Sequence, residues 1–273
     1  MRKSAAGATD EDRSCRADAP NGPGPGGGTG TAEADDRAAK ATAVRRMFSA
    51  VAPRYDLLNH LLSLNIDRRW RRVAVDRLHD RCDPDGLILD SCAGTLDLTA
   101  ALAARRAFRG RIVACDFALP MLERGRPKAA PDRVRIACAD ALRLPLAGQS
   151  VDGAMVGFGV RNLADLEAGL EEFARVLRPG APLVILEFTT PRHQPLRAAY
   201  LFYFERLLPL VGRAVSGHDS AYRYLPESVL RFPAPDDLAG RMRRVGFQAV
   251  RWSSLTGGIA AVHVGERAAI SPA

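Results

Sequence analysis

Short apolar runs alternate with longer amphipathic stretches through the middle of this chain. The runs, each of strand length, are GLILDS (86–91), RIVACD (111–116), RVRIACAD (133–140), VDGAMVGFG (151–159) and PLVILEF (182–188). Helix-like sequence separates them, as in LEAGLEEFARVLRPG (166–180), where Pro179 and Gly180 should end the helix. This alternation predicts an α/β fold in which helices cover both faces of a parallel sheet.

The pattern changes near the C-terminus. A predicted helix over about 235–245 ends at Gly246 and is followed by two strand-like runs, FQAVRWSSL (247–255) and IAAVHVGER (259–267). Gly257 and Gly258 lie between the runs and favour a tight reversal, so the last strand should enter the sheet antiparallel to its neighbours. A Rossmann-like parallel sheet with a reversed C-terminal strand is typical of class I methyltransferases, an expectation that rests on fold analogy.

The N-terminal part divides into two segments. Residues 42–78 carry apolar positions at helical spacing that Pro53 interrupts, which predicts a helical segment in two or three pieces. The first 40 residues include GPGPGGGTGT (22–31) and few apolar side chains, so little burial could offset the entropy cost of ordering them. We therefore expect a disordered, low-complexity tail over 1–40 and a single methyltransferase domain over 41–273.

Charge and cysteine usage indicate which binding partners and which cellular compartment to expect. The net charge is +8, and the first 40 residues contain six Lys and Arg against seven Asp and Glu, so the basic excess lies in the remainder. Such a surface suits an anionic membrane face or a phosphorylated ligand; no basic motif interleaved with aromatic residues indicates a nucleic-acid partner. Five cysteines without CxxC spacing favour free thiols in a reducing compartment. With no apolar segment of signal-peptide or membrane-spanning type, we expect a cytoplasmic protein.

The turn after the first strand is the main candidate for a ligand site. In open α/β sheets ligands bind beyond the carboxyl ends of the strands, and here the strand ends in Asp90, with Gly94 and Thr95 in the turn and Asp97 opening a helix. A dinucleotide site needs three glycines, and Asp97 would repel a pyrophosphate. S-adenosylmethionine carries a cationic sulfonium and an ammonium, so these acids would favour it as the cofactor.

Acids at the next two strand ends extend this site. Asp116 is placed to accept hydrogen bonds from both ribose hydroxyls, Asp140 to reach the adenine amino group, and the backbone of Ala141 to read the ring. Gly157, at the end of the fourth strand, is a further candidate for cofactor contact. Any one of these acids could instead cap a helix, as Asp97 could, but three in register at strand ends favour binding. No cluster with metal-ligand spacing is visible, so no metal is expected.

Several motifs resemble one family. They are YDLLNHLLSLNIDRRW (55–70), DSCAGTLDLT (90–99), DFALPMLERGRPK (116–128), ADALRLPLAGQSVDGAMVGFGVRN (139–162), RVLRPGAPLVILEF (175–188), YRYLPES (222–228) and LTGGIAAVH (255–263). The chain from about 45 to 267 resembles the ubiquinone/menaquinone biosynthesis C-methyltransferases. The resemblance implies methylation of a ring carbon of a polyprenylated hydroquinone, with conversion of demethylmenaquinol to menaquinol favoured. A methyltransferase for another small lipophilic phenol and a non-catalytic binding protein of the same fold are the alternatives.

The chain departs from the family pattern at a few positions. Leu58 stands where methionine is usual, Asp67 where histidine is usual, and Ala181 where a second glycine is usual. The largest departure is Leu96, at a position that is usually glycine or another small residue. A leucine there would either crowd the methionine part of the cofactor or point into the helix packing. We favour a functional but weaker cofactor site, with an inactive descendant as the alternative.

The resemblance also implies catalytic residues. A ring carbon attacks the methyl group only after the adjacent phenol has lost its proton, so a phenolate stabiliser and a proton acceptor are needed. Arg161, which stays protonated, is assigned to holding the phenolate and Asn162 to orienting it. The N-terminal helical segment is expected to fold over the pocket as a lid, with Tyr55 or Asp56 accepting the proton through water.

One apolar segment raises the question of membrane contact. PLRAAYLFYFERLLPLVGRAV (195–215) is too short to span a bilayer and is typical of a buried core helix. An isoprenoid tail offers another use for its apolar surface, and RRWRR (68–72) could contact anionic headgroups. Peripheral membrane contact and a homo-oligomer are therefore further hypotheses.

Overall fold

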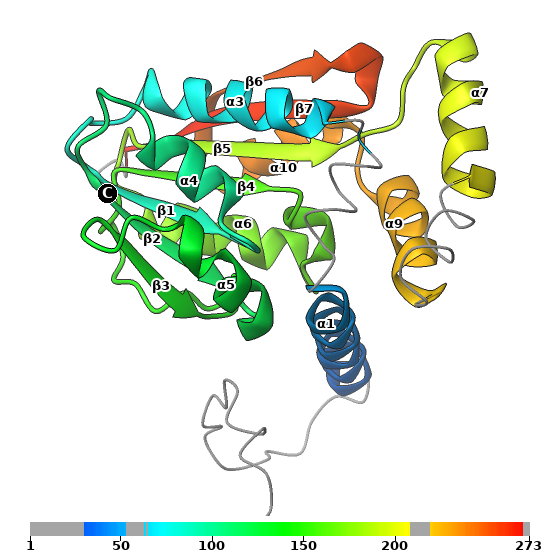
Figure 1. Cartoon of the computed structure of the whole chain (residues 1–273), viewed down its shortest axis with the longest axis horizontal. Helices are drawn as coiled ribbons and strands as arrows, with labels where there is room; N and C mark the ends of the chain where they lie inside the picture. Colours follow the sequence, from blue (N-terminus) through cyan, green and yellow to red (C-terminus); the bar gives the residue numbers. More distant parts are fainter. Residues whose placement is uncertain (1–29, 53–62, 64, 208–218, 270–273) are drawn as a thin grey trace, which may run out of the picture.

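A seven-stranded mixed sheet forms the centre of the protein, in a computed structural model that describes residues 30–52, 63, 65–207 and 219–269 (Figure 1). The strand order is β3-β2-β1-β4-β5-β7-β6. The strands are β1 (Leu87–Ser91), β2 (Arg111–Asp116), β3 (Val134–Cys138), β4 (Gly153–Gly157), β5 (Pro182–Phe188), β6 (Phe247–Leu255) and β7 (Ala260–Arg267). Strands β1 to β5 pair in parallel, whereas β7 is antiparallel to both β5 and β6. The predicted parallel sheet with a reversed C-terminal strand is confirmed.

Helices cover the sheet and its carboxyl edge. They are α1 (Gly30–Val51), α3 (Ile66–His79), α4 (Asp97–Ala103), α5 (Leu119–Gly125), α6 (Leu166–Val176), α7 (Gln194–Phe202), α9 (Asp219–Arg231) and α10 (Pro235–Arg244). Shorter helical turns are η2 (Arg126–Lys128), η3 (Val160–Asn162), the π-helical η4 (Tyr203–Leu207) and η5 (Thr256–Gly258). Each connection between successive parallel strands therefore contains helical sequence, as the alternating pattern predicts, except that between β3 and β4.

The sheet is buried on both faces. Successive residues of β1 point to opposite sides, so Leu89 belongs to the core beneath α6 and α10, and Ile88 to the core beneath α3, α4 and α5. Phe173 of α6 and Trp70 of α3 are among the large side chains that fill these two cores. Burial of each such side chain stabilises the fold by about 1.5 to 3 kcal/mol. This is why the strands are apolar runs rather than alternating ones.

Local sequence explains where elements begin and end. Helix α6 begins after Asp165, whose carboxylate accepts a hydrogen bond from the N–H of Ala168 (3.1 Å). The chain then turns at Gly180, which has a φ of 81°. At the reversal between β6 and β7, Gly257 and Gly258 have φ of 67° and 101°, values that glycine adopts without strain.

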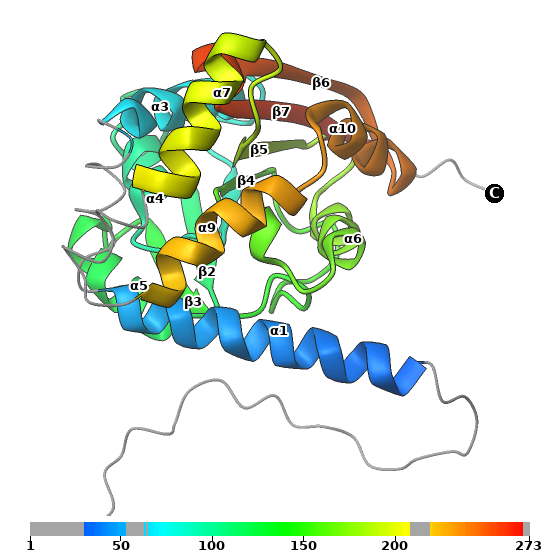
Figure 2. The same cartoon turned by 90° about the vertical axis from the view of Figure 1, so that its right-hand side faces the viewer.

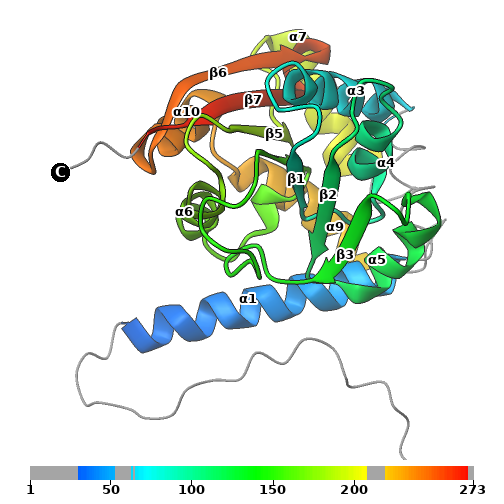
Figure 3. The ribbon, with the colours of Figure 1, turned by 90° about the vertical axis from the view of Figure 1, so that its left-hand side faces the viewer.

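The carboxyl ends of the parallel strands all face one side of the molecule, where α1, α9 and α7 stand (Figure 1). Figures 2 and 3 show α1 running along this edge, and it contacts both α5 and α9. The edge at which ligands bind in open α/β sheets is thus covered by helices from the two ends of the sequence.

Helix α1 corrects the predicted boundary of the tail. Residues 30–40 were expected to be disordered, but they form the first turns of α1. The alanine-rich sequence after Gly30 favours a helix, and two contacts tie it to the domain. Arg37 pairs with Asp165 (2.8 Å), and the ammonium of Lys40 donates to the carbonyl of Leu163 (2.7 Å). Residues 1–29 lie outside the described residues, so for them disorder stays a prediction.

The cysteine prediction holds in part. Cys82, Cys92 and Cys115 are free thiols, whereas Cys138 is disulfide-bonded.

Deleting residues 1–29 is expected to leave the melting temperature and turnover nearly unchanged, because that stretch offers few apolar side chains for burial. Deleting residues 1–40 also removes the contacts of Arg37 and Lys40 and is expected to lower the melting temperature by about 2 to 4 °C, the shift for about 1 kcal/mol in a domain of this size. Thermal unfolding of the two truncations and the full chain measures both. A large loss on removing 1–29 alone would show that the tail docks onto the domain.

Candidate active site

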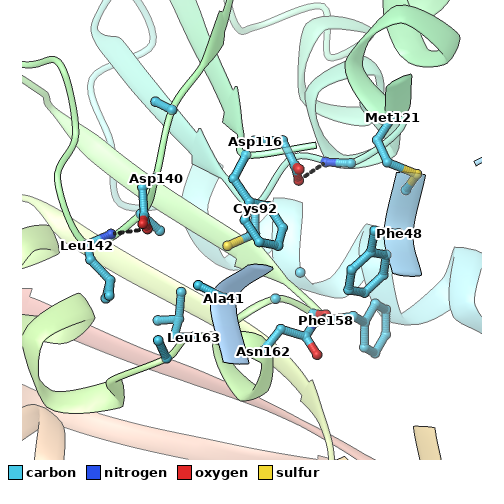
Figure 4. Close-up of a pocket in the computed structure, with 17 residues that line it drawn as sticks. Ala41, Phe48, Cys92, Asp116, Met121, Asp140, Leu142, Phe158, Asn162 and Leu163 are labelled. Carbon is cyan, nitrogen blue, oxygen red and sulfur yellow. Dashed lines mark hydrogen bonds between the residues drawn. The ribbon is translucent and has the colours of Figure 1, made fainter. Parts of the chain in front are cut away.

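A pocket lies at the carboxyl ends of β1, β2, β3 and β4, beneath α1 (Figure 4). Six residues that the sequence predicts for the site line it: Gly94, Asp116, Asp140, Ala141, Gly157 and Asn162. They come from four successive connections of the sheet, so the parallel arrangement brings together residues up to 68 positions apart, from Gly94 to Asn162.

Asp116 is the most constrained of these side chains. One carboxylate oxygen accepts a hydrogen bond from the N–H of Gly94 (2.9 Å) and the other from the N–H of Ala118 (2.8 Å). The residue is 7% exposed, and burial raises its pKa to about 6, against the opposing effect of these N–H groups. Each carboxylate oxygen has a second acceptor position, so Asp116 can also accept from the hydroxyls of a ribose.

The other predicted contacts have different environments. Asp140 is exposed, and its carboxylate accepts a hydrogen bond from the N–H of Leu142 (2.9 Å), which holds the loop after β3 in a tight turn. Gly94 has a φ of 52°, and Gly157 has no space for a side chain because a Cβ would lie 2.6 Å from a methyl carbon of Leu98. Backbone therefore forms much of the floor of the pocket.

Leu96 does not enter the pocket. It precedes the first residue of α4 with φ 64° and ψ 27°, in the left-handed region, and its side chain is fully buried in the core with Trp70 and Leu98. Gly125 leaves space for it, because a Cβ there would lie 2.7 Å from the Cγ of Leu96. Of the two alternatives, the structure supports packing rather than crowding of the cofactor. The cost of leucine here is backbone strain of about 1 to 2 kcal/mol.

Three other predicted cofactor residues do not line the pocket. Asp90 is fully buried, accepts a hydrogen bond from the hydroxyl of Thr99 (2.6 Å), and has its pKa raised to about 7 by burial. Thr95 is 2% exposed. Asp97 pairs with Lys128 (2.7 Å) and lies 3.6 Å from a nitrogen of Arg71. In this arrangement these residues support the turn and the start of α4, and direct cofactor contact by them stays a prediction.

The predicted catalytic pair lies in the turn η3 after β4. Asn162 is 9% exposed, and its side chain donates to the carbonyl of Phe158 (3.2 Å) and accepts from the hydroxyl of Tyr224 (3.1 Å). Arg161 does not line the cofactor pocket, and its guanidinium forms a buried ion pair with Glu187 (2.7 Å). The remaining predicted catalytic residues, Tyr55 and Asp56, lie outside the described residues.

Sequence reasoning missed part of the lining. Ala41 and Phe48 of α1, Cys92, Phe117, Met121 and Phe158 also face the pocket (Figure 4). The signal for Phe48 was its place in the apolar pattern of the N-terminal helical segment. Burial raises the pKa of the Cys92 thiol well above its usual value, so this side chain is a neutral part of the lining rather than a nucleophile.

The lining fits an adenosine-containing cofactor. Asp116 supplies a carboxylate for ribose hydroxyls, Asp140 an exposed acceptor for an amino group, and Phe117 an aromatic side chain for a base. The buried Oδ1 of Asp90 has no hydrogen-bond partner among the described residues, which leaves an acceptor beside the glycine turn. In the described part of the chain, no three His, Cys, Asp or Glu side chains gather where they could hold a metal ion.

The strand order, the reversed final strand and a pocket built on strand-end acids define a class I methyltransferase. Solved structures agree in fold. A methyltransferase solved in complex with the Haloferax volcanii Trm112 activator has a TM-score of 0.60 at 16% identity, over 81% of this chain and 98% of that one. A SAM-dependent methyltransferase from Thermotoga maritima has a TM-score of 0.57 at 18% identity, over 82% and 99%.

The chain belongs to the ubiE/COQ5 methyltransferase family, whose model matches residues 36–267. It is 48% identical to a demethylmenaquinone methyltransferase of Thermus thermophilus, over 81% of this chain and the whole of the relative. It is 44% identical to a demethylmenaquinone methyltransferase of Deinococcus radiodurans, over 85% of this chain and 95% of that one. A ubiquinone/menaquinone biosynthesis C-methyltransferase of Geobacter sp. is also 44% identical, over 84% and 97%.

Asp116→Ala is expected to weaken S-adenosylmethionine binding by about 1.5 to 3 kcal/mol, the range for hydrogen bonds to a charged acceptor. Because the carboxyl protonates as the pH falls through about 6, wild-type affinity should be full above this pH and decline below it, and the variant should lose that dependence. Calorimetry from pH 5 to 8 measures both, with the exposed Asp132→Ala as control. Equal affinities for the two variants would exclude the role given to Asp116.

Leu96→Gly is expected to destabilise the fold by about 1 to 3 kcal/mol, because loss of a buried leucine costs about 2 to 5 kcal/mol and relief of strain returns only part of it. Cofactor affinity should change by less than about threefold, since the side chain lies in the core. Chemical unfolding and calorimetry on the same preparation provide the two values. A large gain in affinity would show that Leu96 restricts the cofactor.

Proposed function

We propose that the protein transfers a methyl group from S-adenosylmethionine to a ring carbon of a hydroquinone, with demethylmenaquinol as the preferred substrate. The observation that carries this proposal is the position of Asn162 and Arg161. Asn162 lines the cofactor pocket, and the residue before it in the chain is a permanently charged arginine in a buried environment. A phenolate beside the transferable methyl group needs such a partner.

The residues have distinct tasks in this reaction. The bound cofactor supplies an electrophilic methyl group. Asp116, Asp140 and the backbone at Gly94 and Ala141 would hold it, and α1 would exclude water from above. Arg161 would stabilise the hydroquinone oxygen after its proton has left, and Asn162 would orient the ring. The ring carbon gains the methyl group and loses its own proton to restore aromaticity. The ring oxygen takes up a proton again, so one proton is released overall.

The choice of a naphthoquinol rests on the relatives. The chains from Thermus thermophilus and Deinococcus radiodurans both carry the name demethylmenaquinone methyltransferase. The Geobacter relative is named for ubiquinone and menaquinone biosynthesis together, so a benzoquinol is the second candidate. Methylation of a lipophilic phenol other than a quinone precursor stays the alternative function.

The proposed substrate carries a polyprenyl tail, so the proposal includes contact between the protein and a membrane surface. No helix among residues 30–52, 65–207 and 219–269 is both long and apolar enough to cross a bilayer. Helices α7 and α9 nevertheless expose large apolar side chains, Leu196 (36%), Phe202 (59%) and Leu230 (48%). These could contact a membrane surface from which the substrate enters. Residues 208–215 of the apolar segment lie outside the described residues. A homo-oligomer stays a hypothesis.

The quinones of cells that lack this protein test the proposal directly. Accumulation of a demethylated menaquinone, reversed by the wild-type gene, is the expected result. An unchanged quinone profile would contradict the proposed substrate. Purified protein with a short-chain demethylnaphthoquinol provides the matching test in solution.

Arg161→Lys is expected to lower turnover about a hundredfold or more while cofactor affinity stays within about threefold, because an ammonium cannot replace the planar guanidinium on both Glu187 and the substrate oxygen. Lysine keeps a positive charge beside Glu187, whereas alanine would leave that carboxylate buried without a cation and destabilise the fold by about 3 to 5 kcal/mol. Single-turnover rates at saturating cofactor measure the effect. Loss of cofactor binding with normal chemistry would place Arg161 in the cofactor site.

A further inference from the structure

A buried polar cluster lies behind η3, formed by Arg161, Glu187, Tyr200 and Tyr224. Arg161 and Glu187 have side chains that are 5% and 0% exposed, with the ion pair at 2.7 Å. The backbone N–H of Arg161 also donates to Glu187 (3.3 Å), and a guanidinium nitrogen donates to the carbonyl of Phe158. A buried carboxylate with this many donors holds the guanidinium in one position.

The two tyrosines come from helices far away in the sequence. Tyr200 of α7 is 5% exposed, and Tyr224 of α9 donates its hydroxyl to Asn162 (3.1 Å). Burial raises the pKa of both phenols, and the charge of Arg161 opposes this rise, so both lie within its field. The cluster thus joins α7 and α9 to the end of β5 and to the turn that carries Asn162.

Two donors of the cluster lack an acceptor. The Nε–H of Arg161 and the hydroxyl of Tyr200 are buried and have no hydrogen-bond partner in the described part of the chain. Buried polar groups are almost always satisfied, so this pair indicates a ligand with an acceptor oxygen. The neighbouring surface is aromatic, because the guanidinium lies 5.4 Å from the centre of the Phe188 ring, and Phe188 packs against the group formed by Tyr200, Phe204 and Val229.

Space for a ligand exists beside Arg161 and Tyr224, the two members of the cluster that line a pocket. Arg161 and Tyr224 line a second pocket of about 420 Å³, together with Val160 and Phe232. This pocket shares Leu163 and Ala164 with the cofactor pocket, and the Tyr224–Asn162 hydrogen bond joins a residue lining one to a residue lining the other. An aromatic ring in the second pocket would therefore meet the cofactor at this boundary.

We propose that this cluster binds one ring oxygen of the hydroquinone, with Arg161 and Tyr200 as donors, Glu187 as the residue that positions Arg161, and Tyr224 as the residue that positions Asn162. The inference rests on the proposed function and adds Glu187, Tyr200 and Tyr224 to its site. Hydrogen bonds to an anion are stronger than those to a neutral hydroxyl, so the two donors lower the pKa of the bound hydroquinone, whose proton passes to water. The phenolate needed for attack thus forms nearer to neutral pH.

Tyr200→Phe tests the inference, with Tyr203→Phe, a half-buried tyrosine three positions further on, as matched control. The first is expected to weaken binding of 2-methyl-1,4-naphthohydroquinone about tenfold, measured anaerobically by calorimetry with S-adenosylhomocysteine present. It should also move the rising limb of the pH profile of kcat/KM upward by about one unit. The control and the cofactor Kd should stay within about twofold. A purely structural Tyr200 would lower stability without moving the pH profile.

Tyr224→Phe and Glu187→Gln extend the test. Tyr224→Phe should lower kcat about tenfold with little change in ring affinity, because only Asn162 loses its partner. Glu187→Gln removes the carboxylate that positions Arg161 and should lower kcat if the variant folds; if it does not fold, Tyr200→Phe alone decides. An active wild type in which Tyr200→Phe matches Tyr203→Phe overturns this inference. A wild type that neither methylates a demethylnaphthoquinol nor binds the ring overturns the proposed function instead.

Discussion

The carboxylate of Asp116 joins the two turns on which the cofactor pocket depends. Its oxygens accept from the N–H of Gly94, in the turn after β1, and of Ala118, in the turn after β2. The two turns, which follow the paired strands β1 and β2, are thereby held at a fixed separation, with the acid between them and still able to accept from a ligand. The burial that makes this arrangement rigid also raises the pKa of the acid to about 6, so the same feature that builds the pocket makes it sensitive to mild acid.

The sequence predicts the sheet well because strands buried on both faces must be apolar runs, and the reversal at Gly257 and Gly258 has a clear turn signature. It also predicts Asp116 and Asp140 at the pocket, since parallel strands align their ends. Prediction from the sequence fails where contacts between residues far apart in the chain determine the position of a side chain. The direction of the Leu96 side chain depends on the space above Gly125, and the contribution of Phe48 depends on how α1 crosses the edge. The disorder expected for 30–40 was wrong because composition does not reveal the contacts of Arg37 and Lys40 with the domain.

The sequence contains an indication of a buried ion pair at Glu187 that the sequence analysis did not use. It interrupts the apolar run PLVILEF, and a fully buried carboxylate in a central strand requires a cation. That cation is Arg161, so the residue that sequence reasoning assigned to the substrate is also a structural partner of the sheet. Its positive charge is balanced by Glu187 within the protein, so in the proposed reaction a neutral, lipophilic ring would enter without meeting an isolated charge. Selectivity can then rest on the direction of hydrogen-bond donors rather than on net attraction.

Leu96 and Cys92 adopt φ of 64° and 54° at positions of the turn where other residues than glycine are strained. The turn therefore requires a backbone dihedral angle rather than a particular residue. A chain can keep the conformation of the turn while it loses the glycines by which the sequence motif is usually recognised. Glycine content is a poor measure of whether such a site has decayed during evolution. Divergent members of the fold are better judged by whether the acids at their strand ends survive, because no backbone adjustment can replace a carboxylate.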